Sequence, residues 1–137
     1  MGVEENKELI RRYTQEVFDK GDVDAVDRHL APDFYNHVTG RSGTDDFKRL
    51  AASLRGASGS LNVIDMLVAE GDLVVAFMTI TRTLHEELHA FGFVFLGNGQ
   101  SYTVMHVHIY RILDGRIREH WAVRDDLSML RQLGAIA

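Results

Sequence analysis

The sequence contains no cysteine and only one proline, Pro32. Without cysteine there can be no disulfide bridges, thiolate catalysis or zinc sites built on cysteine, and such a composition is typical of a reducing compartment. Acidic residues outnumber basic ones by 20 to 15 and no run of five or six like charges occurs, so the basic surface that nucleic-acid binding requires is missing. No apolar stretch approaches the roughly 20 residues of a membrane span. We therefore expect a cytoplasmic protein whose partners include neither nucleic acid nor a membrane.

The first part of the chain has helical periodicity. Apolar residues recur three or four positions apart over 3–20, and a short second helix, capped by Asp22, is expected to stop before Pro32. The segment "DFYNHV" (33–38) then predicts an extended arm. A third helix is expected after Thr44, with Gly56 past its end.

From Leu61 onward the pattern is that of strands. Val, Ile, Thr, Phe and Tyr are frequent, and "EGD" (70–72), "GNG" (97–99) and "LDG" (113–115) are hairpin turn signals, so we expect four or five antiparallel strands and a short closing helix from Asp125 or Asp126. Helices followed by a curved sheet predict a single α+β domain over 1–137. Its N-terminal helices, including those at 3–20 and after Thr44, should cover one face of the sheet and leave a conical hollow suited to a small apolar ligand.

Three histidines fall on the hairpin that spans residues 103–126. A two-residue turn at Asp114-Gly115 would set His108 beside Trp121, whereas a three-residue loop with Gly115 as a bulge would set His120 opposite His108. We favour the bulged loop because it separates polar from apolar side chains. One face then carries His106, His108, Tyr110, His120 and Arg124, and the other carries Met105, Val107, Ile109, Trp121 and Val123.

Three interpretations of these imidazoles are open. They can be polar lining of the hollow, they can carry acid–base chemistry at neutral pH, or they can bind a metal, because H-x-H on one strand with a histidine on its neighbour is a known tris-imidazole arrangement. Of the other candidates, the exposed-looking pair His85 and His89 is expected in a solvated loop, and Trp121 is expected to act as a packing anchor. The alternating Phe91, Phe93 and Phe95 predict strand core or an apolar pocket wall.

Several segments resemble the SnoaL-like polyketide cyclases, α+β cones of the nuclear transport factor 2-like (cystatin-like) superfamily. "HIYRILDGRIREHWAVRDDLSMLRQLG" (108–134) resembles the closing segment of that family, "FDKGDVDAVDRHLAPDFYNH" (18–37) its helical entry and "GTDDFKRL" (43–50) its third helix. The resemblance implies ring closure by intramolecular aldol condensation, without a metal or other cofactor. It also implies cavity-lining roles for Asn36, His106 and His108.

The same resemblance implies a catalytic carboxylate two residues after the histidine of the "EHW" segment, and in this sequence that position is Ala122. A methyl group cannot move a proton, so any acid–base step would have to use a histidine. In addition, the segment 88–103 is longer than in the family and lacks its Pro-Pro-Thr-Gly-like loop. The identity of the substrate is therefore not transferable.

Two functions of different classes follow. The first is a cyclase-, isomerase- or hydrolase-type enzyme acting on an apolar or aromatic molecule, with His106, His108 or His120 as the catalytic base. The second is a non-catalytic protein that binds a small ligand. In both, the expected ligand-binding residues are Asn36, His37, Tyr110, Ala122, Arg124 and Asp125. We also expect a homodimer, because the apolar face of the hairpin is larger than a terminal helix can cover.

Overall fold

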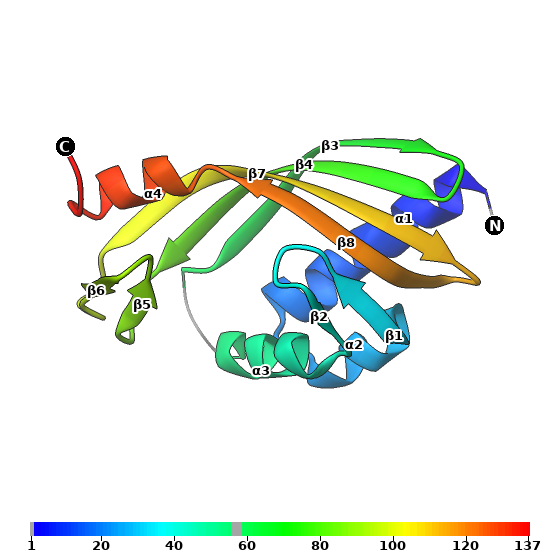
Figure 1. The fold of residues 1–137 in the computed structure, drawn as a ribbon, viewed down its shortest axis with the longest axis horizontal. Helices are drawn as coiled ribbons and strands as arrows, with labels where there is room; N and C mark the ends of the chain where they lie inside the picture. The colour runs from blue at the N-terminus through cyan, green and yellow to red at the C-terminus, as the bar shows by residue number, and fades with distance from the viewer. Residues whose placement is uncertain (1, 56–58) are drawn as a thin grey trace.

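The computed structural model describes residues 2–55 and 59–137. A curved sheet with the strand order β2-β1-β8-β7-β4-β3 lies over the N-terminal helical segments, which all pack beneath one of its faces (Figure 1). The expected α+β cone is confirmed. The elements are α1 (Val3–Tyr13), η1 (Thr14–Asp19), α2 (Val23–His29), β1 (Leu30–Asn36), β2 (Arg41–Ser42), α3 (Asp45–Leu54), β3 (Leu61–Glu70), β4 (Leu73–Thr83), β5 (Leu88–Ala90), β6 (Phe93–Phe95), β7 (Ser101–Leu113), β8 (Arg116–Arg124) and α4 (Asp126–Gln132).

The helical segments follow the expected periodicity with one local change. The helix predicted over 3–20 widens at Thr14 into the π-helical segment η1, a feature that often occurs near functional sites. Asp22 caps α2 through its side chain, which accepts the backbone N–H of Asp24 at 3.0 Å. Thr44 precedes α3 without a side-chain cap bond, and the expected end at Gly56 lies outside the described residues.

From Leu61 onward the chain forms six strands, where four or five were expected. Four of the six later strands join the main sheet, and β5 pairs with β6 in a separate small hairpin. The extended arm is itself a strand, because β1 pairs in parallel with β8 and sets Asn36 beside His120. The sequence pattern did not predict this parallel pairing, which brings the arm to the histidines.

The hairpin register differs from the one that we favoured. Asp114 (φ 53°) and Gly115 (φ 74°) form a two-residue turn, and the extra residue is a bulge near Arg118 in β8 rather than part of the loop. As a result His108 faces Ala122, not His120. The pairing is thus displaced by two residues. Because side chains alternate with period two, this displacement leaves the predicted faces intact.

The core lies between the inner face of the sheet and the helices. Tyr13, Phe34 and Ile117 are among its fully buried side chains. Phe95 is also buried, but Phe93 is 37% exposed and Phe91 is 56% exposed, and neither lines the cavity described below, so the prediction of strand core or a pocket wall was wrong for these two. Phe91 lies in the β5–β6 turn with a positive φ of 54°, and Phe93 lies in β6, which is outside the main sheet. No helix among the described residues is long and apolar enough to cross a bilayer.

Candidate active site

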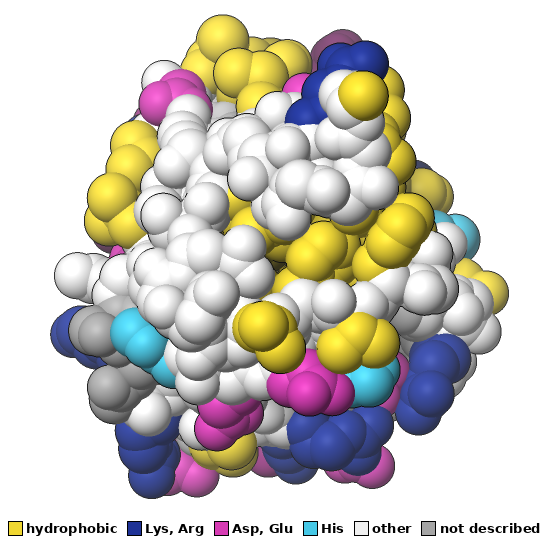
Figure 2. Space-filling view, turned by 90° about the vertical axis from the view of Figure 1, so that its left-hand side faces the viewer, with side chains coloured by type: hydrophobic (Ala, Val, Ile, Leu, Met, Phe, Trp, Pro, Cys, Tyr) yellow, Lys and Arg dark blue, Asp and Glu magenta, His cyan; other side chains and the backbone are white. Residues whose placement is uncertain are grey.

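A cavity of about 340 Å³ lies between the inner face of the sheet and the helices. Viewed from the side of β5, β6 and α4, apolar side chains gather in the middle of the molecular surface, while charged groups lie mostly along the lower edge (Figure 2). The cavity wall combines apolar and polar groups from both layers. It is formed by Tyr13, Thr14, Phe18, Asn36, Val38, Thr39, Asp46, Phe47, Leu50, Asn62, Met78, Ile80, Arg82, Tyr102, His106, His108, Tyr110, His120, Ala122 and Arg124.

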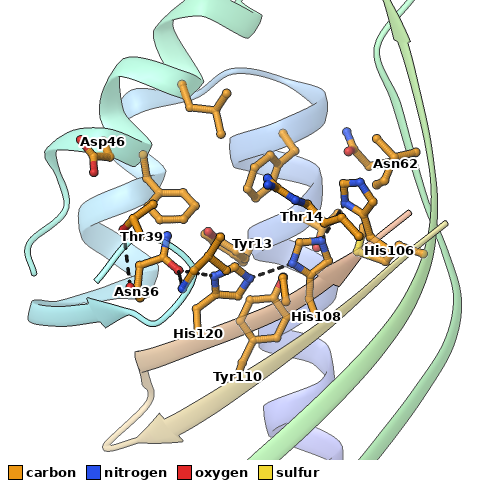
Figure 3. Close-up of a pocket in the computed structure, with 18 of the residues that line it drawn as sticks. Tyr13, Thr14, Asn36, Thr39, Asp46, Asn62, His106, His108, Tyr110 and His120 are labelled. Atoms are coloured by element: carbon orange, nitrogen blue, oxygen red, sulfur yellow. Dashed lines mark hydrogen bonds between the residues drawn. The ribbon is translucent and has the colours of Figure 1, made fainter. Parts of the chain in front are cut away.

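The three histidines of the hairpin form a linear hydrogen-bonded relay on this wall (Figure 3). Nδ1 of His106 lies 3.2 Å from Nε2 of His108, and Nδ1 of His108 lies 2.8 Å from Nε2 of His120. The far end is Asn36, whose Oδ1 lies 3.0 Å from Nδ1 of His120. The relay therefore runs from β1 through β8 to β7 and ends at His106.

The surroundings keep all three rings neutral at pH 7. Burial, with a further contribution from Arg124, lowers the pKa of His106 to about 4 and that of His120 to about 4. Burial and the neighbouring His120 lower the pKa of His108 to about 3. Burial disfavours the charged form of each ring, and protonating one ring disfavours protonation of the next.

Asn36 sets the direction of the relay. Its Oδ1 also accepts the backbone N–H of Val38 at 3.1 Å, as a carbonyl oxygen does. Neutral His120 must therefore donate from Nδ1 and accept at Nε2, so that His108 and then His106 take the same Nδ1–H tautomer. The lone pair of His106 Nε2 is left at the end of the relay. No residue in 2–55 or 59–137 hydrogen-bonds to this nitrogen.

Tyr110 provides a rigid backing for the relay. Its ring stacks on His120 at 5.3 Å and on His108 at 6.0 Å between ring centroids, and Tyr13 packs edge-on against it at 6.0 Å. Burial raises the pKa of Tyr110 well above its usual range, so the phenol stays protonated. Tyr110 therefore shapes the wall without competing for the proton.

The other expected site residues separate into two groups. Asn36, Tyr110, Ala122 and Arg124 line the cavity together with the three histidines. His37 and Asp125 do not. Because side chains alternate along an extended chain, His37 lies on the outer side of the sheet, where it stacks on Trp121 at 4.4 Å. Asp125 caps α4 instead, and its carboxylate accepts the backbone N–H of Ser128 at 3.0 Å.

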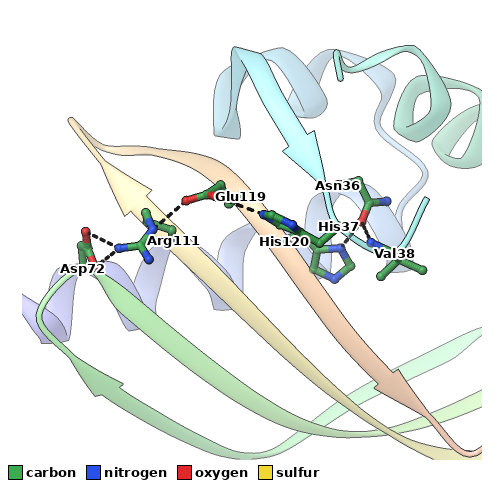
Figure 4. Close-up of polar contacts among 7 residues, drawn as sticks. All are labelled: Asn36, His37, Val38, Asp72, Arg111, Glu119 and His120. Atoms are coloured by element: carbon green, nitrogen blue, oxygen red, sulfur yellow. Dashed lines mark hydrogen bonds and ion pairs between the residues drawn. The ribbon is translucent and has the colours of Figure 1, made fainter. Parts of the chain in front are cut away.

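A polar network on the outer side holds the arm in place (Figure 4). Arg111 donates to Glu119 at 2.6 Å and to Asp72 at 3.0 Å, and Glu119 lies 3.1 Å from Nε2 of His37. The backbone N–H of His37 also donates to the carbonyl oxygen of His120 at 2.8 Å. These contacts fix the residue that follows Asn36 and so support the acceptor end of the relay.

Sequence reasoning missed several residues of the cavity wall. Thr14 and Asn62 gave no usable signal, because one lies in the π-helical segment and the other precedes a bulge in β3. Arg82 could have been found. It continues the inward row of β4 after Met78 and Ile80, and a charged residue at the end of a buried row is unusual.

The geometry does not provide a metal centre among the described residues. No group of three His, Cys, Asp or Glu side chains in that part of the chain is arranged to hold a metal ion. In the relay, neighbouring ring nitrogens face each other at hydrogen-bond distance instead of converging on one point. The arrangement is suited to holding and orienting protons.

The comparisons with known proteins agree with this fold. Residues 8–133 match the family model of the SnoaL-like polyketide cyclases. The structure of TsrD from Streptomyces laurentii is similar, with a TM-score of 0.79, 27% identity and 99% coverage of both chains. A candidate polyketide cyclase from Acidithiobacillus ferrooxidans has a TM-score of 0.79 and 26% identity over 97% of this chain and 96% of that one. An epoxide hydrolase of the LEH-like type from M. tuberculosis shares the fold, with a TM-score of 0.71, 19% identity and coverage of 96% and 86%. No curated protein matches.

Proposed function

Because the chain belongs to the SnoaL-like polyketide cyclase family, we propose that it is a cyclase- or isomerase-type enzyme acting on a small apolar or aromatic carbonyl compound. The base in this proposal is Nε2 of His106. One observation carries it: the relay from Asn36 ends in a ring that is neutral at pH 7 and whose outer nitrogen keeps its lone pair.

The proposed reaction begins at a carbon next to a carbonyl group. Nε2 of His106 takes the proton from that carbon, and the electron pair of the broken C–H bond moves onto the carbonyl oxygen as an enolate. The enolate carbon then attacks a second carbonyl of the same molecule, which forms a C–C bond and leaves an alkoxide that takes the proton. Alternatively, where a conjugated double bond extends the enolate to a dienolate, the far carbon of the dienolate is protonated. In both cases His106 returns the proton. Arg124, which faces His106 across the β7–β8 pair, is the candidate donor to the enolate oxygen.

The remaining imidazoles act on His106 in this proposal. When Nε2 of His106 gains a proton, the charge can be shared along the relay, because His108 accepts the Nδ1–H of His106 and His120 accepts the Nδ1–H of His108. His108 and His120 are therefore positioning residues. A base whose conjugate acid has a pKa of about 4 suits carbon acids that are already activated, such as an aryl-stabilised ketone.

Deuterium exchange tests the first step without a known substrate. The probe is 2-tetralone in D₂O, with deuterium at C1 followed by NMR. We expect the protein to accelerate exchange, His106→Ala to reduce the rate to background, and His89→Gln to leave it unchanged, since His89 is 68% exposed. The variant His108→Gln should retain part of the rate because an amide can both accept from His106 and donate to His120. Equal rates for the wild type and His106→Ala would refute the assignment.

A second candidate is a non-catalytic protein that binds a small ligand in the same cavity. The observation in its favour is Ala122, which presents a methyl group to the cavity opposite His108, at the position where the family resemblance implies a carboxylate. Ala122→Asp separates the two functions. If the wild type is only a binder, exchange of 2-tetralone should rise from background in this variant. If His106 is the base, the wild type exchanges the probe on its own.

A further inference from the structure

The inward row of β4 ends in an arginine that lacks an acidic partner. Arg82 lines the cavity and is only partly exposed, yet its guanidinium forms no ion pair with a carboxylate of the described residues. Its two contacts are neutral. Nη1 donates to the carbonyl oxygen of Thr81 at 3.1 Å and Nη2 donates to Oδ1 of Asn62 at 3.0 Å. A guanidinium has five N–H donors, so several remain for a ligand.

No group around Arg82 forms an ion pair with it among the described residues, although Asp19 offsets part of its charge from a greater distance. Asn62 lies between Arg82 and the nearest acid on that side, since its amide donates to Asp19 at 2.8 Å while its oxygen accepts from Arg82. Tyr102 pairs with Arg82 across the β4–β7 ladder and, with its pKa raised mainly by burial, carries no charge at pH 7. The same end of the cavity thus holds a positive charge and hydrogen-bond donors.

A second arginine lies on the neighbouring part of the cavity wall. Arg124 also lines the cavity and is paired with Asp126 at 3.5 Å. Both arginines act on His106, lowering its pKa in addition to the effect of burial. Leaving guanidinium donors without partners in a partly buried setting is costly, and a ligand anion would satisfy them.

We propose that the Arg82 end of the cavity is a carboxylate subsite, so that the ligand is an apolar or aromatic molecule bearing a free carboxylate. The planar guanidinium matches the two oxygens of a carboxylate, and the partly buried setting strengthens the charge-assisted hydrogen bonds. The reacting carbonyl would then lie toward His106, next to Arg124. This subsite refines the substrate class of the proposed enzyme and rests on that function only for the identity of the reacting group.

Binding of a matched acid and amide tests the subsite. The probes are 2-naphthoate and 2-naphthamide, which have nearly the same shape and differ in charge, and their affinities are measured by calorimetry. We expect the wild type to bind the acid at least tenfold more tightly than the amide. Arg82→Gln should reduce this ratio to about one with little change for the amide, and Arg82→Lys should retain part of it. Arg11→Gln, at an exposed position on α1, is the matched control and should behave as the wild type.

Three results would each contradict the proposed subsite. Equal affinities for acid and amide in the wild type, an unchanged ratio in Arg82→Gln, or no binding of 2-naphthoate at millimolar concentration would each overturn the subsite. If circular dichroism shows that Arg82→Gln is unfolded, two other measurements decide. The first is the ratio of acid to amide affinity in Arg82→Lys. The second is the effect of added NaCl on the wild type, which should weaken binding of the acid but not of the amide. Naphthoate has no exchangeable proton next to its carboxylate. His106→Ala should therefore abolish exchange of 2-tetralone and keep the preference for the acid, so failure of the function and failure of the subsite are distinguishable.

Discussion

Mild acid should destabilise this protein through its three relay histidines. In the unfolded chain a histidine has a pKa of about 6.5. In the fold the pKa values of His106, His108 and His120 are about 4, about 3 and about 4. Between these limits the unfolded state binds protons that the folded state does not, so the free energy of unfolding falls as the pH is lowered from 6.5 toward 4.

The magnitude follows from the same values. At pH 5 each of the three depressed histidines contributes a loss of about 2 kcal/mol relative to pH 7, or about 6 kcal/mol if the three act independently. A domain of this size is stable by roughly 5–15 kcal/mol, so the loss is a large part of the total. The free energy of unfolding changes most steeply with pH where all three rings are protonated in the unfolded state and none is protonated in the folded state.

Urea unfolding at pH 7, 6 and 5 measures this dependence. His108→Gln removes one titrating ring while keeping a donor and an acceptor between His106 and His120, so its loss between pH 7 and 5 should be about 2 kcal/mol smaller than that of the wild type. His89→Gln, an exposed position in the separate β5–β6 hairpin, should lose as much as the wild type. Identical losses for the wild type and His108→Gln would show that the relay is not held neutral by the fold.

Three further predictions concern the arm, a turn and the outer face. Asn36→Asp places a carboxylate about where Oδ1 now lies, 3.0 Å from Nδ1 of His120, and should raise the pKa of that ring by roughly 1–3 units, as followed by NMR titration; an unchanged value would contradict the contact. Gly21→Ala should lower the free energy of unfolding in urea by about 3 kcal/mol or more, because φ is +66° and the added Cβ would lie 2.5 Å from a backbone nitrogen. Gly71→Ala is the control: its φ is +57°, but the added Cβ would meet no atom, so the loss should be only about 1–2 kcal/mol. The homodimer stays a prediction: the wild type should sediment at twice the 15.5 kDa chain mass at micromolar concentration, and Val123→Asp, at a position 71% exposed on the apolar outer face, should sediment as a monomer.

The faces of the hairpin could be predicted more reliably than its register. Sorting polar from apolar side chains distinguishes a strand pairing shifted by an odd number of residues from one shifted by an even number, because only an odd shift exchanges the two faces. Displacements that differ by two residues give the same sorting. The sequence therefore placed His106, His108 and His120 on one wall, while the pairing of His108 with Ala122 depended on a bulge in β8 that has no sequence signal.

Residues that reach the site through long-range pairing were harder to predict. Asn36 was expected in the cavity only through the family resemblance, and its contact with His120 arises from the parallel pairing of β1 with β8. His37 was misplaced because the alternation of side chains along the extended arm, which places neighbouring residues on opposite sides, was not applied to it. Arg82 was missed for a different reason: strand periodicity alone places it on the inward face, but only the packed structure shows that it has no acidic partner there.

The electrostatics of the cavity connect the missing acid to the carboxylate subsite. A carboxylate at position 122 would lie on the inner face one alternation from Arg124, so it would supply negative charge inside the cavity. Ala122 supplies none, and the pKa values keep the histidines uncharged at pH 7. Asp46, the one carboxylate among the described residues of the cavity wall, is paired with Arg41 and Arg49, so no carboxylate of that wall pairs with Arg82. In our proposal the anion that pairs with Arg82 comes with the ligand. By this reasoning Ala122→Asp should weaken the preference for 2-naphthoate over 2-naphthamide while raising the pKa of His108, since one introduced charge opposes the first and favours the second.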